Sequence, residues 1–176
     1  NLACTLNRDH HLDSAIQHGT PRGGGDDDVA HAALRACLGS ADDRARTLHA
    51  LLSDDVADVH VAQAYLRQRP ITDAAELRAV ADAVAQLPPG ATQVRALEAL
   101  ARHYIEDREV LQDLVGLFSA TPSAAVQAAI AGILIRADRR ALPGDDLVAV
   151  LTRDRRPAPD GGDAIIDALI RTLQPP

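Results

Sequence analysis

Short amphipathic helices separated by regularly spaced helix breakers are the feature that most constrains the fold of this chain. Apolar residues recur every three or four positions from Leu77 to Leu87 and again from Val126 to Leu134. This spacing is typical of a helix that buries one side. No stretch alternates apolar and polar residues in the way that predicts a β-strand. The sequence therefore predicts an all-α fold.

Pro, Gly, Ser and Asp interrupt the apolar pattern at intervals along the chain. Pro and Gly end helices, and a Ser, Thr or Asp at the break can accept hydrogen bonds from the free N–H groups of the next helix. Between the breaks we expect helices that pair into about five helical hairpins. Their predicted ranges are 9–18, 27–38, 41–52, 55–69, 72–87, 91–105, 107–118, 123–137, 143–152 and 160–173.

One sequence pattern recurs along the chain. It reads LLSDDVADVHVAQAYL from Leu51, LPPGATQVRALEALA from Leu87 and LFSATPSAAVQAAIAGIL from Leu117. Each copy has the end of a helix, a short polar turn, and then Val, a polar residue and small apolar residues. A period of roughly 30 to 40 residues is the mark of stacked helical hairpins, each buried against its neighbours. We expect one α-solenoid domain over 1–176, with an irregular segment at 1–26 and repeats at 27–173.

These three phrases resemble HEAT repeats, especially the short type also called PBS-lyase-like. Asp54 and Asp55 match the acidic turn of that pattern, and Val94-Arg95 matches the start of its second helix, whereas Gln127 replaces the Arg. The resemblance covers about 41–137 well and 143–173 loosely. It implies a right-handed α-α superhelix whose second helices line a concave face.

The resemblance also implies a function. Protein binding is the commonest role of such repeats, and we expect a non-enzymatic scaffold, as part of a larger protein of bacterial type. An accessory lyase or cofactor-handling protein of the PBS-lyase HEAT-like type is the alternative. In the family the turn Asp and the Arg form an internal polar ladder. No Asp precedes Arg95 here, so we expect Arg95 to be free to face a partner.

The composition argues against two classes of partner. The net charge is −7 and aromatic residues make up only 2% of the chain, whereas binding to nucleic acid needs a basic face and, for handling single bases, aromatic side chains. No apolar run is long enough to span a membrane. We expect neither partner and no cofactor, and cytoplasmic localisation is the default. Hydrophobic residues make up 47% of the chain, and because so few of them are aromatic the sequence predicts an aliphatic core.

No catalytic or metal-binding motif stands out. His10, His11 and His18 lack the spacing of metal ligands, because adjacent helical residues point in different directions. The glycine-rich segment GTPRGGGD at 19–26 is followed by acidic residues rather than by the Lys-Ser/Thr of a phosphate-binding loop, and we interpret it as a loop. Cys4 and Cys37 allow one disulfide, and we interpret them as reduced thiols, with Cys37 a small buried side chain.

The first and the second helix differ in charge in two of the predicted hairpins. The first helices at 72–87, 107–118 and 143–152 are acidic, whereas the second helices at 91–105 and 123–137 are slightly basic. Ordinary solvated faces would account for this division. The alternative is that the acidic side keeps the protein in solution, while the second helices meet an acidic or polar partner.

Helical spacing predicts a polar stripe on the concave side, and this stripe is the candidate partner-binding surface. Residues three and seven positions beyond Arg95 share its face, and the same spacing occurs on the preceding second helix. An unused solvated stripe is the alternative. The residues of the predicted stripe are His60, Gln63, Arg67, Arg95, Glu98, Arg102, Gln127 and Asp167.

The same spacing predicts a continuous core beside the stripe. Val94, Leu97 and Ala101 should turn toward this core rather than toward solvent. Its predicted members are Val94, Leu97, Leu100, Leu111, Leu114, Val126 and Ile130.

Overall fold

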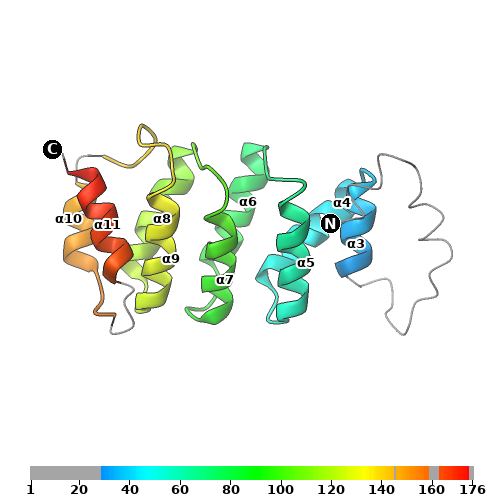
Figure 1. The fold of residues 1–176 in the computed structure, drawn as a ribbon, viewed down its shortest axis with the longest axis horizontal. Coiled ribbons are helices and arrows are strands. Elements are labelled where there is room, and N and C mark those ends of the chain that lie inside the picture. Colours follow the sequence, from blue (N-terminus) through cyan, green and yellow to red (C-terminus); the bar gives the residue numbers. More distant parts are fainter. Residues whose placement is uncertain (1–28, 145, 159–162, 175–176) are drawn as a thin grey trace. The chain divides into compact units, whose positions relative to one another are not determined.

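A computed structural model describes residues 29–144, 146–158 and 163–174, and it is helical throughout (Figure 1). Within these ranges it contains nine α-helices, α3 to α11, and one 3-10 helix, and no strand. The predicted all-α fold is therefore confirmed. The predicted helix 9–18 and the loop at 19–26 lie outside the described residues.

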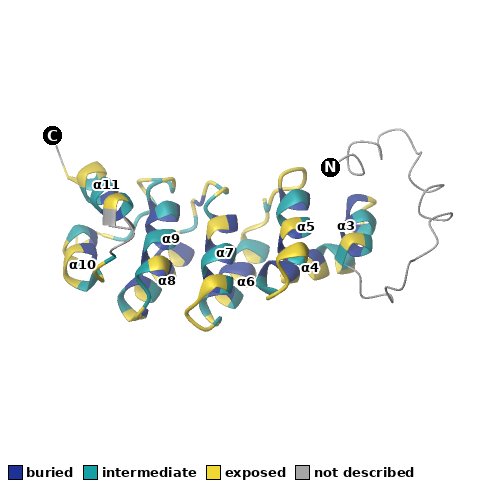
Figure 2. Cartoon of the chain, turned by 60° about the horizontal axis from the view of Figure 1, so that its bottom comes forward, coloured by how far each residue is buried: buried dark blue, intermediate teal, exposed yellow. Residues whose placement is uncertain are grey.

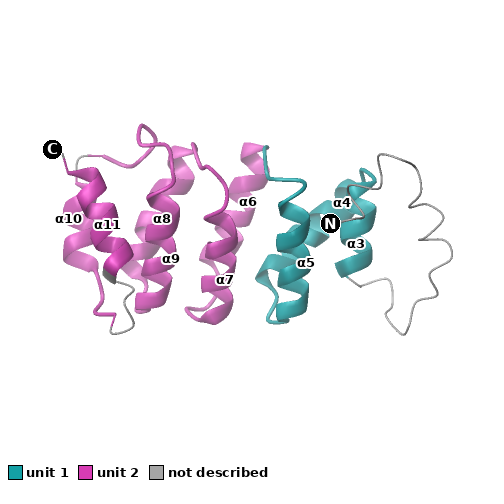
Figure 3. Ribbon diagram, viewed as in Figure 1, with its two compact units in different colours: residues 1–72 teal, residues 73–176 magenta. Residues whose placement is uncertain are grey.

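The chain divides into two compact units, residues 1–72 and 73–176 (Figure 3). In the described part of the first unit, α3 (Val29–Cys37) packs against both α4 (Ala41–His49) and α5 (Val56–Leu66). The 3-10 helix η2 (Ala50–Leu52) extends α4 and also contacts α5.

The side chain of Arg44 joins α4 to α5 within the first unit. The guanidinium of Arg44 donates a hydrogen bond to the hydroxyl of Tyr65 at 2.9 Å and lies 5.6 Å from the centre of its ring. It also donates to the carbonyls of Arg69 and Pro70. The contact combines a charge-assisted hydrogen bond with a cation–π interaction, so it fixes the segment that follows α5.

Cys37 lies at the end of α3, and its side chain is buried, as we expected. It is not a free thiol, so the interpretation of Cys37 as a reduced side chain is wrong. Cys4 lies outside the described residues.

The second unit consists of six helices in two layers. One layer holds α6 (Ala74–Ala85), α8 (Arg108–Ala120) and α10 (Leu147–Asp154), with α8 in contact with the other two. The other layer holds α7 (Ala91–Leu100), α9 (Ala124–Leu134) and α11 (Asp163–Leu173), with α9 between its neighbours. Each helix of the first layer also contacts the helix that follows it in the chain, so the unit is built from successive hairpins.

Polar side chains cap the first turns of several described helices, at or near the predicted breaks. The Asp107 carboxylate accepts hydrogen bonds from the N–H groups of Glu109 and Val110, and so caps α8. Such a cap satisfies N–H groups that have no partner inside the helix. The other side chains that cap α-helices in this way are Ser40, Asp55, Asp73 and Ser123.

Two helix boundaries differ from the predicted ones by about one turn. The helix predicted at 91–105 ends at Leu100, and Ile105 beyond it is fully buried. Ile105 also accepts a backbone hydrogen bond from Asp138 through its carbonyl. The helix predicted from 143 begins at Leu147, because Gly144 has a φ of +37°, which does not continue a right-handed helix.

The core of the second unit fills the space between its two layers (Figure 2). Six of the seven predicted core residues are buried, with Leu97, Leu100, Leu111, Val126 and Ile130 at 0% exposure and Leu114 at 2%. The seventh, Val94, is only half-buried. The prediction that Val94 and Ala101 turn into the core is wrong, because both line the groove described below.

Candidate functional site

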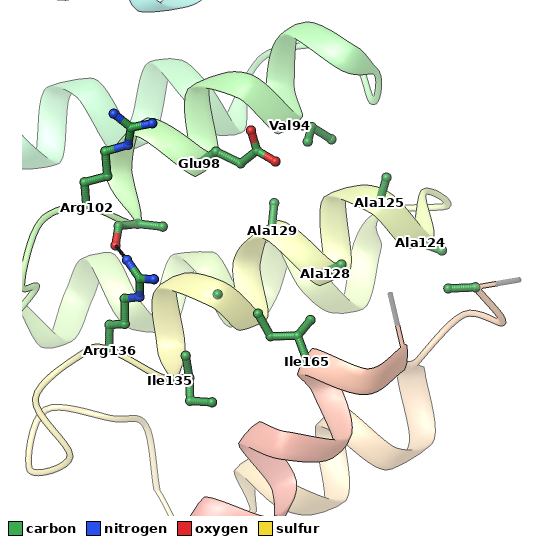
Figure 4. A pocket seen from close by; sticks show the side chains of 13 residues that line it. Val94, Glu98, Arg102, Ala124, Ala125, Ala128, Ala129, Ile135, Arg136 and Ile165 are labelled. Atoms are coloured by element: carbon green, nitrogen blue, oxygen red, sulfur yellow. Dashed lines mark hydrogen bonds between the residues drawn. The ribbon is translucent and has the colours of Figure 1, made fainter. Parts of the chain in front are cut away.

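A groove of about 700 Å³ lies on the α7–α9–α11 layer of the second unit (Figure 4). Helix α9 forms its floor, and residues of α7 and α11 form its walls. The residues that line it are Val94, Glu98, Ala101, Arg102, Ala124, Ala125, Ala128, Ala129, Gly132, Ile135, Arg136, Ala158 and Ile165.

The floor is low because α9 presents only small side chains on this side. Val126, Ile130 and Ile133 are buried on the opposite side of α9. The exposed and half-buried positions between them are Ala or Gly, where an ordinary surface helix would carry long polar side chains. A Cβ on Gly132 would meet Cδ1 of Ile165 at 3.5 Å, an ordinary contact distance. The hollow therefore follows from side-chain size along one face of α9.

Three charged side chains line the groove. Glu98 and Arg102 come from the α7 wall, one helical turn apart, and Arg136 follows the end of α9. All three residues are exposed. Figure 4 shows Arg102 and Arg136 at the same end of the groove, with Glu98 nearer its middle.

These charges are available to a ligand. Arg136 donates one hydrogen bond, to the carbonyl of Ala101 at 3.2 Å. A guanidinium has five N–H donors, so others remain. The side chains of Glu98 and Arg102 form no hydrogen bond or ion pair with any described residue. The groove is thus a trough with an alkyl floor, two cations at one end and an anion along one wall.

The structure separates Arg95 from the two residues predicted to share its face. Arg95 is half-buried and donates a hydrogen bond to the hydroxyl of Thr92 at 3.1 Å. Its Nε is buried without a hydrogen-bond partner. Glu98 and Arg102 lie instead four and eight positions after Val94, and with Val94 they line the groove. The expectation that Arg95 is free to face a partner is not met.

Gln127 is fully buried, so its predicted place on an exposed stripe is wrong. Its amide donates hydrogen bonds to the carbonyls of Phe118 at 2.8 Å and Asp154 at 2.9 Å. Its Oε1 accepts a hydrogen bond from the N–H of Arg156 at 2.7 Å. Gln127 therefore ties α9 to the ends of α8 and α10, and it has no donor or acceptor left facing a ligand.

The structural counterpart of Gln127 is Gln93 rather than Arg95. Both amides donate to a carbonyl nine residues earlier in the chain, and for Gln93 this is the carbonyl of Val84 at 3.1 Å. Gln93 is also fully buried. The predicted alignment of the repeats was thus displaced by two residues, which explains why it placed Gln127 on the wrong face.

None of the remaining stripe residues lines the groove. Asp167 on α11 accepts a hydrogen bond from Arg155 at 2.7 Å, in an ion pair with the residue that ends α10. His60 and Arg67 are exposed and Gln63 is half-buried on α5, in the other unit.

Two acidic residues of the α6–α8–α10 layer, Asp107 and Asp154, have structural roles. Arg78 on α6 donates to the carboxylate of Asp107 at 2.7 Å and also lies 3.1 Å from Glu109. This hydrogen bond, together with those from two backbone N–H groups, holds the pKa of Asp107 below its ordinary value. Hydrogen bonds from Arg153 and Ser119 lower the pKa of Asp154 to about 2. Both carboxylates are therefore ionised at neutral pH and join adjacent helices.

Most of the groove was absent from the predicted stripe, which includes neither Arg136 nor Ile165 nor the small residues of α9. A signal is present in the sequence, because Ala125, Ala129 and Gly132 occupy one face of α9 at helical spacing. Such a face does not by itself predict a groove, because small side chains also allow close packing between helices.

Among the described residues, no group of His, Cys, Asp and Glu side chains could hold a metal ion, and no helix is long and apolar enough to cross a membrane. No protein-family model, curated protein or solved structure is significantly similar to the chain.

Proposed function

We propose that this chain is a non-enzymatic protein-interaction module, a short HEAT-like α-solenoid that binds a segment of another protein in the groove over α9. The observation that carries the proposal is the groove itself, with its floor of Ala and Gly and its unpaired charged rim. Alkyl, carboxylate and guanidinium groups suit the apolar core and polar rim of a protein interface. The two-layered hairpins of the second unit support the solenoid part of the proposal.

The shape of the groove also favours a polypeptide ligand. Surfaces that bind peptides often use a trough between helices to receive an apolar side of the ligand, with charges at the edges that set specificity. Here the trough follows the length of α9. Its small side chains let a ligand approach the helix closely without rearrangement.

The test is affinity capture with a matched pair of variants. Ala128→Trp fills the middle of the groove, whereas Gln112→Trp places the same side chain on an exposed position of α8, in the other layer. Captured proteins should be purified and their direct binding to each variant measured. We expect at least one protein to bind the wild type and Gln112→Trp equally and to lose roughly tenfold or more in affinity for Ala128→Trp.

Thermal unfolding shows whether each variant is as stably folded as the wild type. If Ala128→Trp unfolds at a lower temperature, Arg102→Glu replaces it, because Arg102 is exposed and makes no ion pair with a described residue. Retention of every direct partner by both folded groove variants would refute the proposed site.

A further inference from the structure

The order of charges along the groove distinguishes its two ends. Glu98 on α7 precedes Arg102, which lies just beyond the end of that helix, by four residues, and both side chains are exposed and unpaired among the described residues. Four residues of helix correspond to about 6 Å along the axis. Arg136 adds a second cation at the Arg102 end, where α7 and α9 both terminate. A complementary ligand therefore needs an acidic group at that end and a basic group about one helical turn away.

The walls and floor favour a helical ligand over an extended one. An extended peptide gains affinity by pairing its backbone with a sheet edge, but the groove is formed chiefly by helices, whose backbone groups are already bonded within each helix. A helix satisfies its own backbone and presents a side-chain face to the floor. Helix α9 has 11 residues, a length of about 16 Å, which matches three turns of a ligand helix.

We infer that the groove binds an amphipathic partner helix that runs antiparallel to α9, with a Glu facing Arg102 and Arg136 and a Lys four residues later facing Glu98. This inference rests on the proposed function and specifies its partner. The sequence order follows from the direction, because a helix that is antiparallel to α9 begins at the arginine end.

Two properties of helices support this direction. A Glu that precedes a Lys by four residues stabilises a helix more than the reverse order does. Acidic residues near the start of a helix also interact favourably with its dipole. In the opposite direction, a ligand with the same charge complementarity would need Lys before Glu, the less favourable order. Antiparallel packing additionally places the positive end of the ligand dipole beside the negative end of α9.

The test uses two synthetic helical peptides. Both are capped at their ends, carry Ala and Leu on one face and differ at two positions, which are Glu and Lys four residues apart in one peptide and Gln at both in the other. Fluorescence anisotropy at low salt should show that the Glu/Lys peptide binds the wild-type chain roughly 3- to 10-fold more tightly, the sum expected from exposed ion pairs. This difference should vanish in a variant that carries Glu98→Gln, Arg102→Gln and Arg136→Gln together.

The direction is read by a nitroxide spin label at the N-terminus of the Glu/Lys peptide. The label should broaden the amide signals of Arg102 and Arg136 more strongly than those of Ala124 and Ala125. Stronger broadening at Ala124 and Ala125 would overturn the antiparallel arrangement.

The affinity measurements separate this inference from the function on which it rests. Equal affinity of the two peptides, with both weakened by Ala128→Trp, would overturn the charge assignment but leave the groove as a binding site. No binding of either peptide would overturn the inference, and the capture experiment would then decide the proposed function on its own.

Discussion

Two buried glutamines show how single residues connect the helices of the second unit. Gln127 uses both ends of its amide, and its Oε1 accepts from the N–H of Arg156, 29 residues later. The residue 29 positions after Gln93 is Pro122, which has no N–H to donate. Accordingly, the Oε1 of Gln93 is buried without a hydrogen-bond partner. Gln93 thus makes one of the three hydrogen bonds that Gln127 makes, and Pro122 accounts for the bond that its Oε1 lacks.

We therefore expect the two glutamines to differ in their contribution to stability. Gln127→Leu should lower the free energy of unfolding by about 2–4 kcal/mol, because it leaves backbone groups of three residues, one of them fully buried, without that partner. Gln93→Leu should cost less than about 1 kcal/mol, because it also removes an unsatisfied oxygen. The carbonyl of Val84 would keep its hydrogen bond from the N–H of Leu87. Urea unfolding of both variants measures the difference, and equal losses would contradict this account.

At the scale of the element, most of the helices could be predicted from the sequence. Breaks such as the one before Ser123 carry both the signal that ends a helix and the cap that begins the next one. The errors arose where tertiary structure overrides the local pattern. The apolar spacing in 91–105 continues past Leu100, but the chain leaves the helix there, and Ile105 becomes buried. Local periodicity contains no information about that choice.

The cap of α8 should make the stability of the protein depend on pH. Because Arg78 and two N–H groups lower the pKa of Asp107, the ionised carboxylate stabilises the folded state at pH values above its ordinary pKa of 3.8. This contribution is lost as the pH falls below that value toward the lower pKa of the folded state. Asp107→Asn keeps a capping side chain but cannot ionise, so its deficit relative to wild type should be largest near pH 7 and shrink toward pH 2.

The pH profile is obtained from urea unfolding between about pH 2 and pH 7. Arg78→Gln provides the matched control, since it removes the guanidinium and keeps the carboxylate. Its deficit should shrink over the same range of pH. A deficit of Asp107→Asn that stays constant with pH would show that the ion pair makes no contribution.

At the scale of the whole molecule, the candidate site was less predictable than the fold. The predicted stripe assumed that polar residues at matching repeat positions share an exposed face. Only Glu98 and Arg102 of that stripe line the groove. A displacement of two residues in the alignment turns a helix by more than half a turn, which is why Gln127 is buried instead. The floor was missed for a different reason. Small side chains form a hollow only when their helix lies between two others, and the packing of α9 against α7 and α11 is a tertiary fact.

The central claim is that ligands bind on the α7–α9–α11 layer of the second unit. The most direct test is an NMR titration of the ¹⁵N-labelled chain with the Glu/Lys peptide or with a purified partner. We predict that the largest changes in amide chemical shift fall on groove residues, among them Glu98, Ala125, Ala129, Gly132 and Arg136. Changes concentrated on α6, α8 and α10 would contradict the claim, as would saturation of the chain with ligand while the signals of these five residues remain unmoved.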